Sequence, residues 1–96
     1  MAKKVVWSLK AQKDRRRILK YWKGRNKSNV YSIKLAQLFK DSVKIISEFP
    51  QIGKLTDDIN VRIKIVKDYY ILYEETNTQI HILTVWDSRQ DPDELK

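Results

Sequence analysis

The last third of the chain contains three short β-rich runs separated by short polar turns, and this arrangement constrains the fold more than any other feature. The runs cover residues 61–65, 69–74 and 80–86. Residues 67–68 and 75–78 connect them, and connections of this length join antiparallel neighbours in hairpins. The pattern therefore predicts a three-stranded antiparallel meander.

The first of these runs alternates strictly between apolar and basic residues. Val61, Ile63 and Ile65 alternate with Arg62 and Lys64. Because successive side chains of a strand point to opposite faces of the sheet, the two bases share one face. We expect the apolar residues to face the core, and the bases to lie on an uncovered face of the sheet or at its rim.

Two helices are expected before the meander. Residues 11–25 carry apolar side chains at helical spacing among many bases, which predicts a basic amphipathic helix that ends near Gly24. A second helix follows and is ended by Pro50 and Gly53. Its apolar face consists of Tyr31, Leu35, Leu38, Phe39, Ser42, Ile45, Ile46 and Phe49. An apolar face of this length must be buried, and we expect the helix to pack it against a β-sheet.

The whole chain is expected to form one α+β domain over residues 1–96. Residues 4–9 are β-branched and aromatic and predict a strand before the helices. The resulting order is β-α-α-β-β-β, with the helices packed on one face of the sheet. Asp91 and Pro92 are placed as the cap and first-turn residue of a short final helix.

Charge is distributed unevenly along the sequence. Residues 3–40 hold thirteen of the twenty Lys and Arg residues and a single acid, Asp14, which gives this segment a net charge of +12. The remainder carries −4. A cationic surface of this kind attracts acidic proteins or nucleic acids through long-range steering.

Several classes of protein do not fit the sequence. Cysteine is absent, so disulfide scaffolds and thiolate metal sites are excluded, and the chain is expected in the reducing cytoplasm. The apolar run near the start is too short for a signal peptide or a membrane span. We expect no membrane partner, no metal and no cofactor.

In its order of elements and in four segments, the chain resembles the RelE/ParE superfamily of toxins from bacterial type II toxin–antitoxin modules. The likeness extends over almost the whole sequence, and the last segment is most similar to the ParE-related branch. The segments are VVWSLKAQKDRRRILKYW, FPQIGKL, VRIKIVKDYYILYE and ILTVWDSRQDPDEL.

For ribosome-dependent members of the superfamily, the resemblance implies cleavage of messenger RNA through attack of a ribose 2′-hydroxyl on the adjacent phosphorus. Arg62 matches the strand arginine of the family and Arg89 approximates its late arginine, so both would stabilise the scissile phosphate. Lys54 and Lys64 would add cationic support, and Asp87 is a candidate proton acceptor.

The sequence departs from the ribonuclease pattern at its end. Active ribonucleases of this family tend to end in a segment with His or Tyr, and neither follows Trp86 here. The single histidine, His81, lies within a predicted strand and is expected to be a half-buried packing residue. Whether the chain is an endoribonuclease therefore stays open. The ParE branch is associated with inhibition of DNA gyrase, which requires no acid and base.

Two plainer interpretations stand beside these. Arg62 is explained equally well as a solvated strand residue paired with Asp87 or Glu74, and an Asp at a strand end usually caps or pairs locally. The whole chain, with its +12 segment, is also typical of a basic nucleic-acid-binding module without toxicity.

The resemblance also implies a dedicated partner, an antitoxin whose flexible segment wraps the toxin and folds on binding. The excess of bases predicts that the partner is acidic. We expect the contact to include one face of the first helix, formed by Lys13, Arg16, Arg17 and Lys20.

Overall fold

The computed structural model describes residues 2–26, 29–58 and 60–89. The predicted order of strand, two helices and three strands is confirmed, and a short 3-10 turn and a two-residue strand are added after the second helix. The elements are β1 (Lys4–Trp7), α1 (Leu9–Asn26), α2 (Val30–Glu48), η1 (Pro50–Ile52), β2 (Lys54–Leu55), β3 (Val61–Val66), β4 (Tyr69–Glu75) and β5 (Gln79–Asp87).

The strands form one sheet in the order β1-β5-β4-β3-β2. The predicted meander is present, because β3, β4 and β5 pair as antiparallel neighbours. The first strand lies beside the last and runs parallel to it, with Val5 opposite Ile80. A parallel pair needs a long connection, and here the two helices and the meander together supply it.

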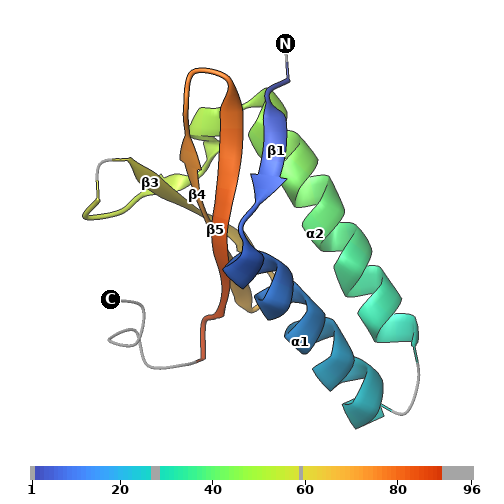
Figure 1. Ribbon diagram of the computed structural model, residues 1–96. Coiled ribbons are helices and arrows are strands. Elements are labelled where there is room, and N and C mark those ends of the chain that lie inside the picture. Colours follow the sequence, from blue (N-terminus) through green and yellow to red (C-terminus); the bar gives the residue numbers. More distant parts are fainter. Residues whose placement is uncertain (1, 27–28, 59, 90–96) are drawn as a thin grey trace.

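Both helices cover the same face of the sheet and lie side by side as a hairpin (Figure 1). The predicted apolar face of α2 is confirmed at Leu35, Phe39 and Ile46, which are fully buried. It is wrong at Ile45 and Phe49, which are 39% and 63% exposed. Phe39 packs edge-on against Tyr69 of β4, with ring centroids 5.8 Å apart. Each large side chain buried in this layer contributes roughly 1.5–3 kcal/mol of hydrophobic stabilisation.

The expected facing of β3 is wrong. Arg62 lies opposite Tyr73, and Lys64 lies opposite Ile71. Tyr73 and Ile71 are fully buried beneath the helices, and residues directly opposite each other share a face of the sheet. The two bases are therefore on the helix side of β3, and Ile65 is 46% exposed on the uncovered face.

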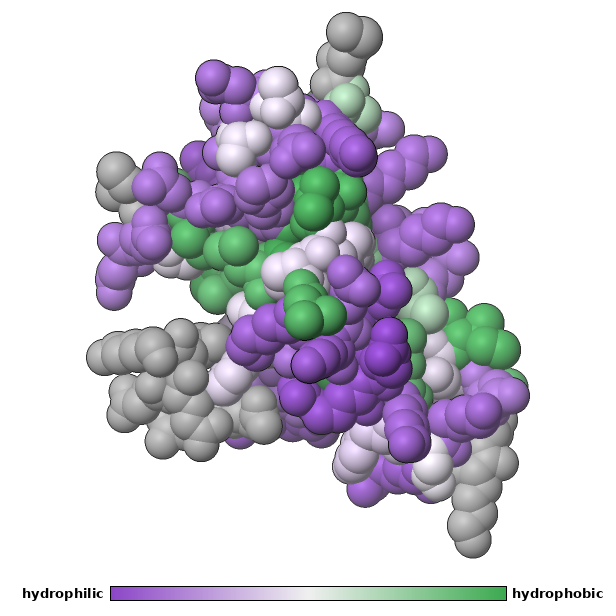
Figure 2. All heavy atoms as spheres, viewed as in Figure 1, coloured by the Kyte–Doolittle hydropathy of each residue, from purple (hydrophilic) through white to green (hydrophobic). Residues whose placement is uncertain are grey.

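The physical reason is that β3 lies towards the edge of the sheet. All its residues from Val61 to Lys64 are only half-buried, so neither face of the strand is fully covered. Alternation fixes which side chains share a face but not which of the two faces meets the helices. The uncovered face therefore carries Ile63 and Ile65 of β3, and Figure 2 shows green residues gathered over the region of β3 and β4.

A bulge shapes the end of β5. Thr84 lies opposite Leu72 and Ile82 lies opposite Tyr73, which leaves Leu83 without a partner in β4. An extra residue of this kind bends and twists the strand locally. As a result, the consecutive residues Thr84 and Val85 are both buried against the helix layer.

Two expectations concern the ends of elements. The predicted short helix that begins at Asp91 and Pro92 lies outside the described residues. Helix α1 begins two residues earlier than expected, because Ser8 caps it: the hydroxyl of Ser8 accepts a hydrogen bond from the backbone N–H of Ala11 at 3.0 Å. Neither of the two described helices has the apolar length that crossing a membrane requires.

Candidate functional site

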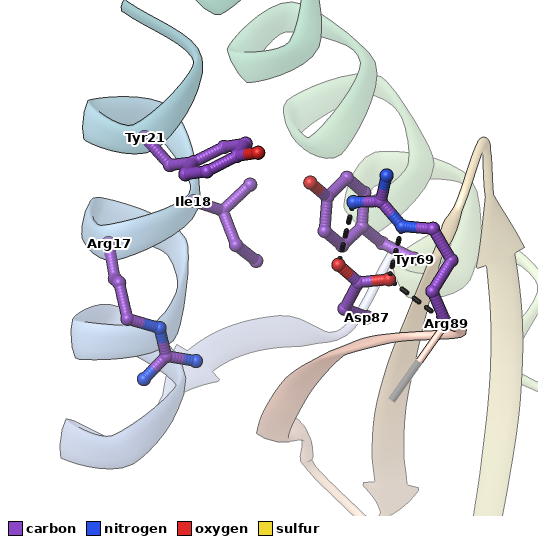
Figure 3. A pocket seen from close by; sticks show the side chains of 6 residues that line it. All are labelled: Arg17, Ile18, Tyr21, Tyr69, Asp87 and Arg89. Atoms are coloured by element: carbon purple, nitrogen blue, oxygen red, sulfur yellow. Dashed lines mark hydrogen bonds and ion pairs between the residues drawn. The ribbon is translucent and has the colours of Figure 1, made fainter. Parts of the chain in front are cut away.

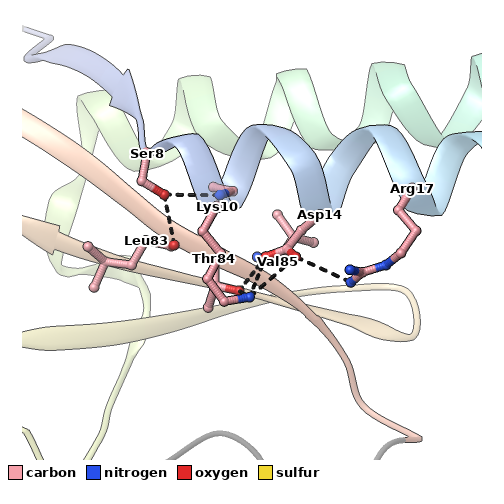
Figure 4. A network of polar contacts seen from close by, with 8 residues as sticks. Ser8, Lys10, Asp14, Arg17, Leu83, Thr84 and Val85 are labelled. Atoms are coloured by element: carbon pink, nitrogen blue, oxygen red, sulfur yellow. Dashed lines mark hydrogen bonds and ion pairs between the residues drawn. The ribbon is translucent and has the colours of Figure 1, made fainter.

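A buried carboxylate joins α1 to the last strand. Asp14 is 2% exposed, and its oxygens accept hydrogen bonds from the hydroxyl of Thr84 at 2.5 Å and from the backbone N–H of Val85 at 3.2 Å. Lys10 and Arg17, one turn away on either side, form ion pairs with it at 3.1 and 3.2 Å. Figure 4 shows these donors converging on Asp14 from both elements.

The environment of Asp14 favours its charged form. Burial acts to raise the pKa of this carboxyl, but the hydrogen bonds from Thr84, Lys10 and Val85 and the charge of Lys10 outweigh it and hold the pKa below 3.8. The only acid of the +12 segment is therefore an internal anchor. Lys10 and Arg17 remain well exposed while they pair with it.

A cleft separates α1 from the end of β5. It has a volume of about 320 Å³, and we call it the Tyr69 cleft. Figure 3 shows its lining side chains, which come from α1, β4, the end of β5 and the turn after it. They are Arg17, Ile18, Tyr21, Tyr69, Asp87 and Arg89.

Tyr69 forms the inner wall of this cleft. It is 2% exposed, and its hydroxyl accepts a hydrogen bond from the indole N–H of Trp22 at 2.7 Å. Burial raises the pKa of Tyr69, so the phenol stays protonated at neutral pH and can donate a hydrogen bond. Trp22 is in turn packed edge-on between Tyr21 and Tyr31.

Asp87 and Arg89 form a two-point ion pair at the outer wall. The Nε and Nη2 atoms of Arg89 donate to the two carboxylate oxygens of Asp87 at 2.9 and 2.7 Å. This hydrogen bonding, opposed by partial burial, lowers the pKa of Asp87. The guanidinium also lies 5.9 Å from the centre of the Trp22 ring. Asp87 thus pairs locally, as the plainer sequence interpretation expects.

Arg62 lies elsewhere and binds backbone carbonyls. Its Nη1 atom donates to the carbonyl oxygen of Gly53 at 2.9 Å and to that of Gln51 at 3.3 Å. The hydroxyl of Tyr73 ties the same loop down, accepting from the N–H of Gly53 at 2.9 Å and donating to the carbonyl of Pro50 at 2.7 Å. Arg62 therefore holds η1 and the residue before β2 against β3, and among the described residues it is not paired with Asp87 or Glu74.

The two arginines expected at one phosphate are not neighbours. Arg62 lies opposite Tyr73 of β4, whereas Asp87, the partner of Arg89, lies opposite Tyr69. Four residues along a strand correspond to about 13 Å. Lys54 and Lys64 are also separated, because Lys54 lies opposite Ile63 on the uncovered face and Lys64 is on the helix side.

His81 is half-buried, as expected, and it lies on the uncovered face. One of its ring nitrogens lies 2.8 Å from the side-chain oxygen of Gln79, and the other lies 3.6 Å from Glu74. Within residues 2–26, 29–58 and 60–89, no cluster of His, Asp and Glu has the size that a metal site needs.

The predicted basic face of α1 is exposed to solvent at Lys13, Arg16, Arg17 and Lys20. Arg17 also lines a second cleft beside the first, of about 400 Å³, which we call the Lys13 cleft. Its lining residues are Leu9, Lys10, Lys13, Asp14 and Arg17.

Sequence reasoning missed Asp14 and Tyr69 as site residues. The one available signal was that Asp14 stands alone among thirteen bases.

Comparison with known proteins bears on these sites. The family model described as the ParE toxin of the type II toxin-antitoxin system, parDE, matches residues 5–92. Among solved structures, a chain of the chromosomal ParDE TA system from P. aeruginosa superposes with a TM-score of 0.76 and 17% sequence identity, over 90% of this chain and 96% of that chain. No curated protein sequence matches. At this identity the superposition supports the fold alone, and the family assignment depends on the family model.

Proposed function

Because the chain belongs to the ParE toxin family of type II toxin–antitoxin systems, we propose that it arrests growth by inhibiting DNA gyrase and that a cognate acidic antitoxin holds it inactive. The toxin class and the existence of an antitoxin follow from the family. The choice of gyrase as target depends on the geometry of the arginines.

The observation that supports gyrase is the separation of Arg62 from Arg89. Cleavage of messenger RNA needs cations gathered at one phosphate, with an acid and a base within hydrogen-bond reach of the reacting oxygens. Arg62 is instead bound to the carbonyls of Gly53 and Gln51, and Arg89 is bound to Asp87. The candidate base, Asp87, is thus already occupied, and its pKa is lowered.

An inhibitor that acts by binding needs only a complementary surface. The exposed bases of α1 and the uncovered face of the sheet both offer one. Ribosome-dependent cleavage stays the competing candidate, with Arg62, Arg89 and Asp87 in the roles that the resemblance assigns and Lys54 and Lys64 as cationic support.

Measurements in growth-arrested cells distinguish gyrase from the ribosome as the target. The chain is expressed from an inducible promoter without its antitoxin, and plasmid supercoiling, DNA breaks and transcript 5′ ends are measured in the arrested cells. We expect loss of negative supercoiling or trapped DNA breaks. Codon-phased transcript cuts with normal supercoiling would contradict the proposal and favour the ribosome, and continued growth would favour the non-toxic nucleic-acid-binding module.

The antitoxin is proposed to contact the face formed by Lys13, Arg16, Arg17 and Lys20. All four side chains are exposed, and the one acid of their segment, Asp14, is buried beneath them. Reversal of the four charges should weaken antitoxin binding strongly at low salt and less at high salt, because exposed charges are screened. Unchanged affinity at both salt concentrations would contradict this contact.

A further inference from the structure

Two adjoining clefts follow the flank of α1 that faces β5, and they meet at Arg17. The Tyr69 cleft lies on the C-terminal side of Arg17 and the Lys13 cleft lies on its N-terminal side. Figure 3 shows Arg17 reaching out from α1 at the edge of the Tyr69 cleft, while Ile18 and Tyr21 point into it. Together the clefts extend along α1 from Leu9 to Tyr21. The lining residues of the Lys13 cleft all belong to α1, whereas residues of β4, of β5 and of the turn after it also line the Tyr69 cleft.

The hydroxyl of Tyr69 has an unused hydrogen. It accepts from Trp22, but its own O–H finds no acceptor among the described residues. Figure 3 shows this hydroxyl directed into the cleft, between Tyr21 and the Asp87–Arg89 pair. A side chain that is 2% exposed and keeps a free donor is suited to a ligand that brings an acceptor.

The other unused groups at the clefts are donors as well. Arg89 binds Asp87 through Nε and Nη2, which leaves Nη1 for another partner. Arg17 binds Asp14 through Nη2 alone, and Lys13 makes no ion pair with the described residues. A ligand that satisfies this set must accept hydrogen bonds and carry negative charge.

We propose that the two clefts receive two acidic side chains of a single antitoxin segment, one on each side of Arg17. The identity of the partner rests on the proposed function, whereas the chemistry of the clefts does not. Lys13 and Tyr21 are eight residues apart on α1, which corresponds to about 12 Å. The two acids therefore lie about eight residues apart in a helical segment, or about four apart in an extended one.

The walls of the two clefts favour a peptide over a nucleic acid. Leu9 and Tyr21, at the two ends, are 67% and 50% exposed, so apolar side chains of a peptide can pack beside each acid. Asp14 and Asp87 are already paired with cations and stand between the unpaired donors of the two clefts, so these donors do not form the continuous cationic row that a chain of phosphates would need. Single carboxylates on flexible side chains reach the donors without lying along these two acids.

Binding of the cognate antitoxin by calorimetry tests the proposal with matched variants. We expect Arg17→Gln and Tyr69→Phe each to weaken binding about tenfold or more, because each removes a donor to a charged acceptor. Lys40→Gln, which removes an exposed charge from α2, and Tyr70→Phe, which removes a hydroxyl on the uncovered face, should bind like the wild type. Thermal unfolding confirms that each variant is folded.

An antitoxin scan then identifies the acids. Each acid of the antitoxin is changed in turn to its amide, and the loss of affinity is measured with the wild-type toxin and with both toxin variants. The acid of the Lys13 cleft should show a smaller loss with Arg17→Gln but an unchanged loss with Tyr69→Phe, whereas the acid of the Tyr69 cleft should show a smaller loss with Tyr69→Phe. If the toxin binds the antitoxin and both variants keep wild-type affinity, the clefts are not the site, although the toxin–antitoxin proposal stands.

A second measurement does not depend on the antitoxin. The indole N–H of Trp22 donates to Tyr69, so its nuclear magnetic resonance signal reports on that hydroxyl. Synthetic peptides with two glutamates, about four or about eight residues apart, should shift this signal saturably, and their glutamine analogues should not. An unmoved signal would overturn the proposal. So would a single-stranded DNA oligonucleotide that shifts the signal more strongly than the peptides.

Discussion

The hydroxyl of Thr84 donates a hydrogen bond of 2.5 Å to the carboxylate of Asp14, across 70 residues of sequence. The bond is possible because the bulge at Leu83 turns Thr84 and the N–H of Val85 together towards α1. A single buried carboxylate thereby fixes the position of α1 against the strand that ends at Asp87. Both clefts along this helix depend on that position.

We expect Asp14→Asn to lower the free energy of unfolding by about 3 kcal/mol, because an amide cannot accept from Thr84, Val85 and Lys10 together and leaves buried donors unpaired. Urea unfolding followed by circular dichroism measures the loss. Asp41→Asn is the matched control, since Asp41 is exposed on α2 and its side chain accepts a hydrogen bond from Gln37 and from no other described residue. A loss no larger than that of the control would contradict the anchoring role of Asp14.

Stability should also depend on pH through Asp14 and Asp87. The folded protein lowers the pKa of both carboxyls below the value of 3.8, so each contributes stability that is fully present above that pH. The contribution is lost as the pH falls through the folded pKa of each group. Unfolding measured between about pH 5 and pH 2.5 should show a steeper loss for the wild type than for Asp14→Asn. Equal slopes would show that Asp14 does not titrate as a stabilised carboxylate.

The sequence was sufficient to predict the order of the elements, because each signal was local. The apolar positions of α2 recur at a fixed spacing, and the polar turns of the meander are short. The structure confirms both turns and most of the apolar face of α2, although Ile45 and Phe49 are exposed. The facing of β3 was not predictable in this way. Ile63 and Arg62 alternate whichever face is covered, and the choice depends on tertiary contacts such as the bond from Arg62 to the carbonyl of Gly53.

The candidate site was harder to predict, because its residues come together only through tertiary contacts. Asp14 attracts notice in the sequence as the one acid among thirteen bases, but its burial depends on a bulge 70 residues away. Tyr69 carries no signal that separates it from Tyr70, and only pairing places its hydroxyl beside Trp22. Arg62 and Arg89 were grouped by family resemblance, and the strand register separates them.

The two glycines should respond to alanine in opposite directions. A Cβ at Gly53 would lie 2.6 Å from the hydroxyl of Tyr73 and 3.0 Å from the carbonyl of Ile63, so Gly53→Ala should destabilise the fold by about 1–3 kcal/mol. Gly24 is exposed in α1 with nothing within 4 Å, and Gly24→Ala should stabilise the fold by about 0.5–1 kcal/mol. Thermal unfolding of both variants measures the two shifts. Tolerance of Gly53→Ala would mean that the loop around η1 can move away from Tyr73.

Substitutions of Arg62 and of Arg89 should reduce growth arrest independently of each other. Their strand positions are about 13 Å apart along β4, and sites this far apart without shared partners have additive effects. Arg62→Ala removes the bonds to Gly53 and Gln51 and should cost stability, whereas Arg89→Ala leaves Asp87 unpaired beside Tyr69. We measure growth arrest for each single variant and for the double variant, at matched protein levels. The reductions should add on a logarithmic scale, and a double variant no weaker than either single one would indicate that the two arginines serve one shared phosphate.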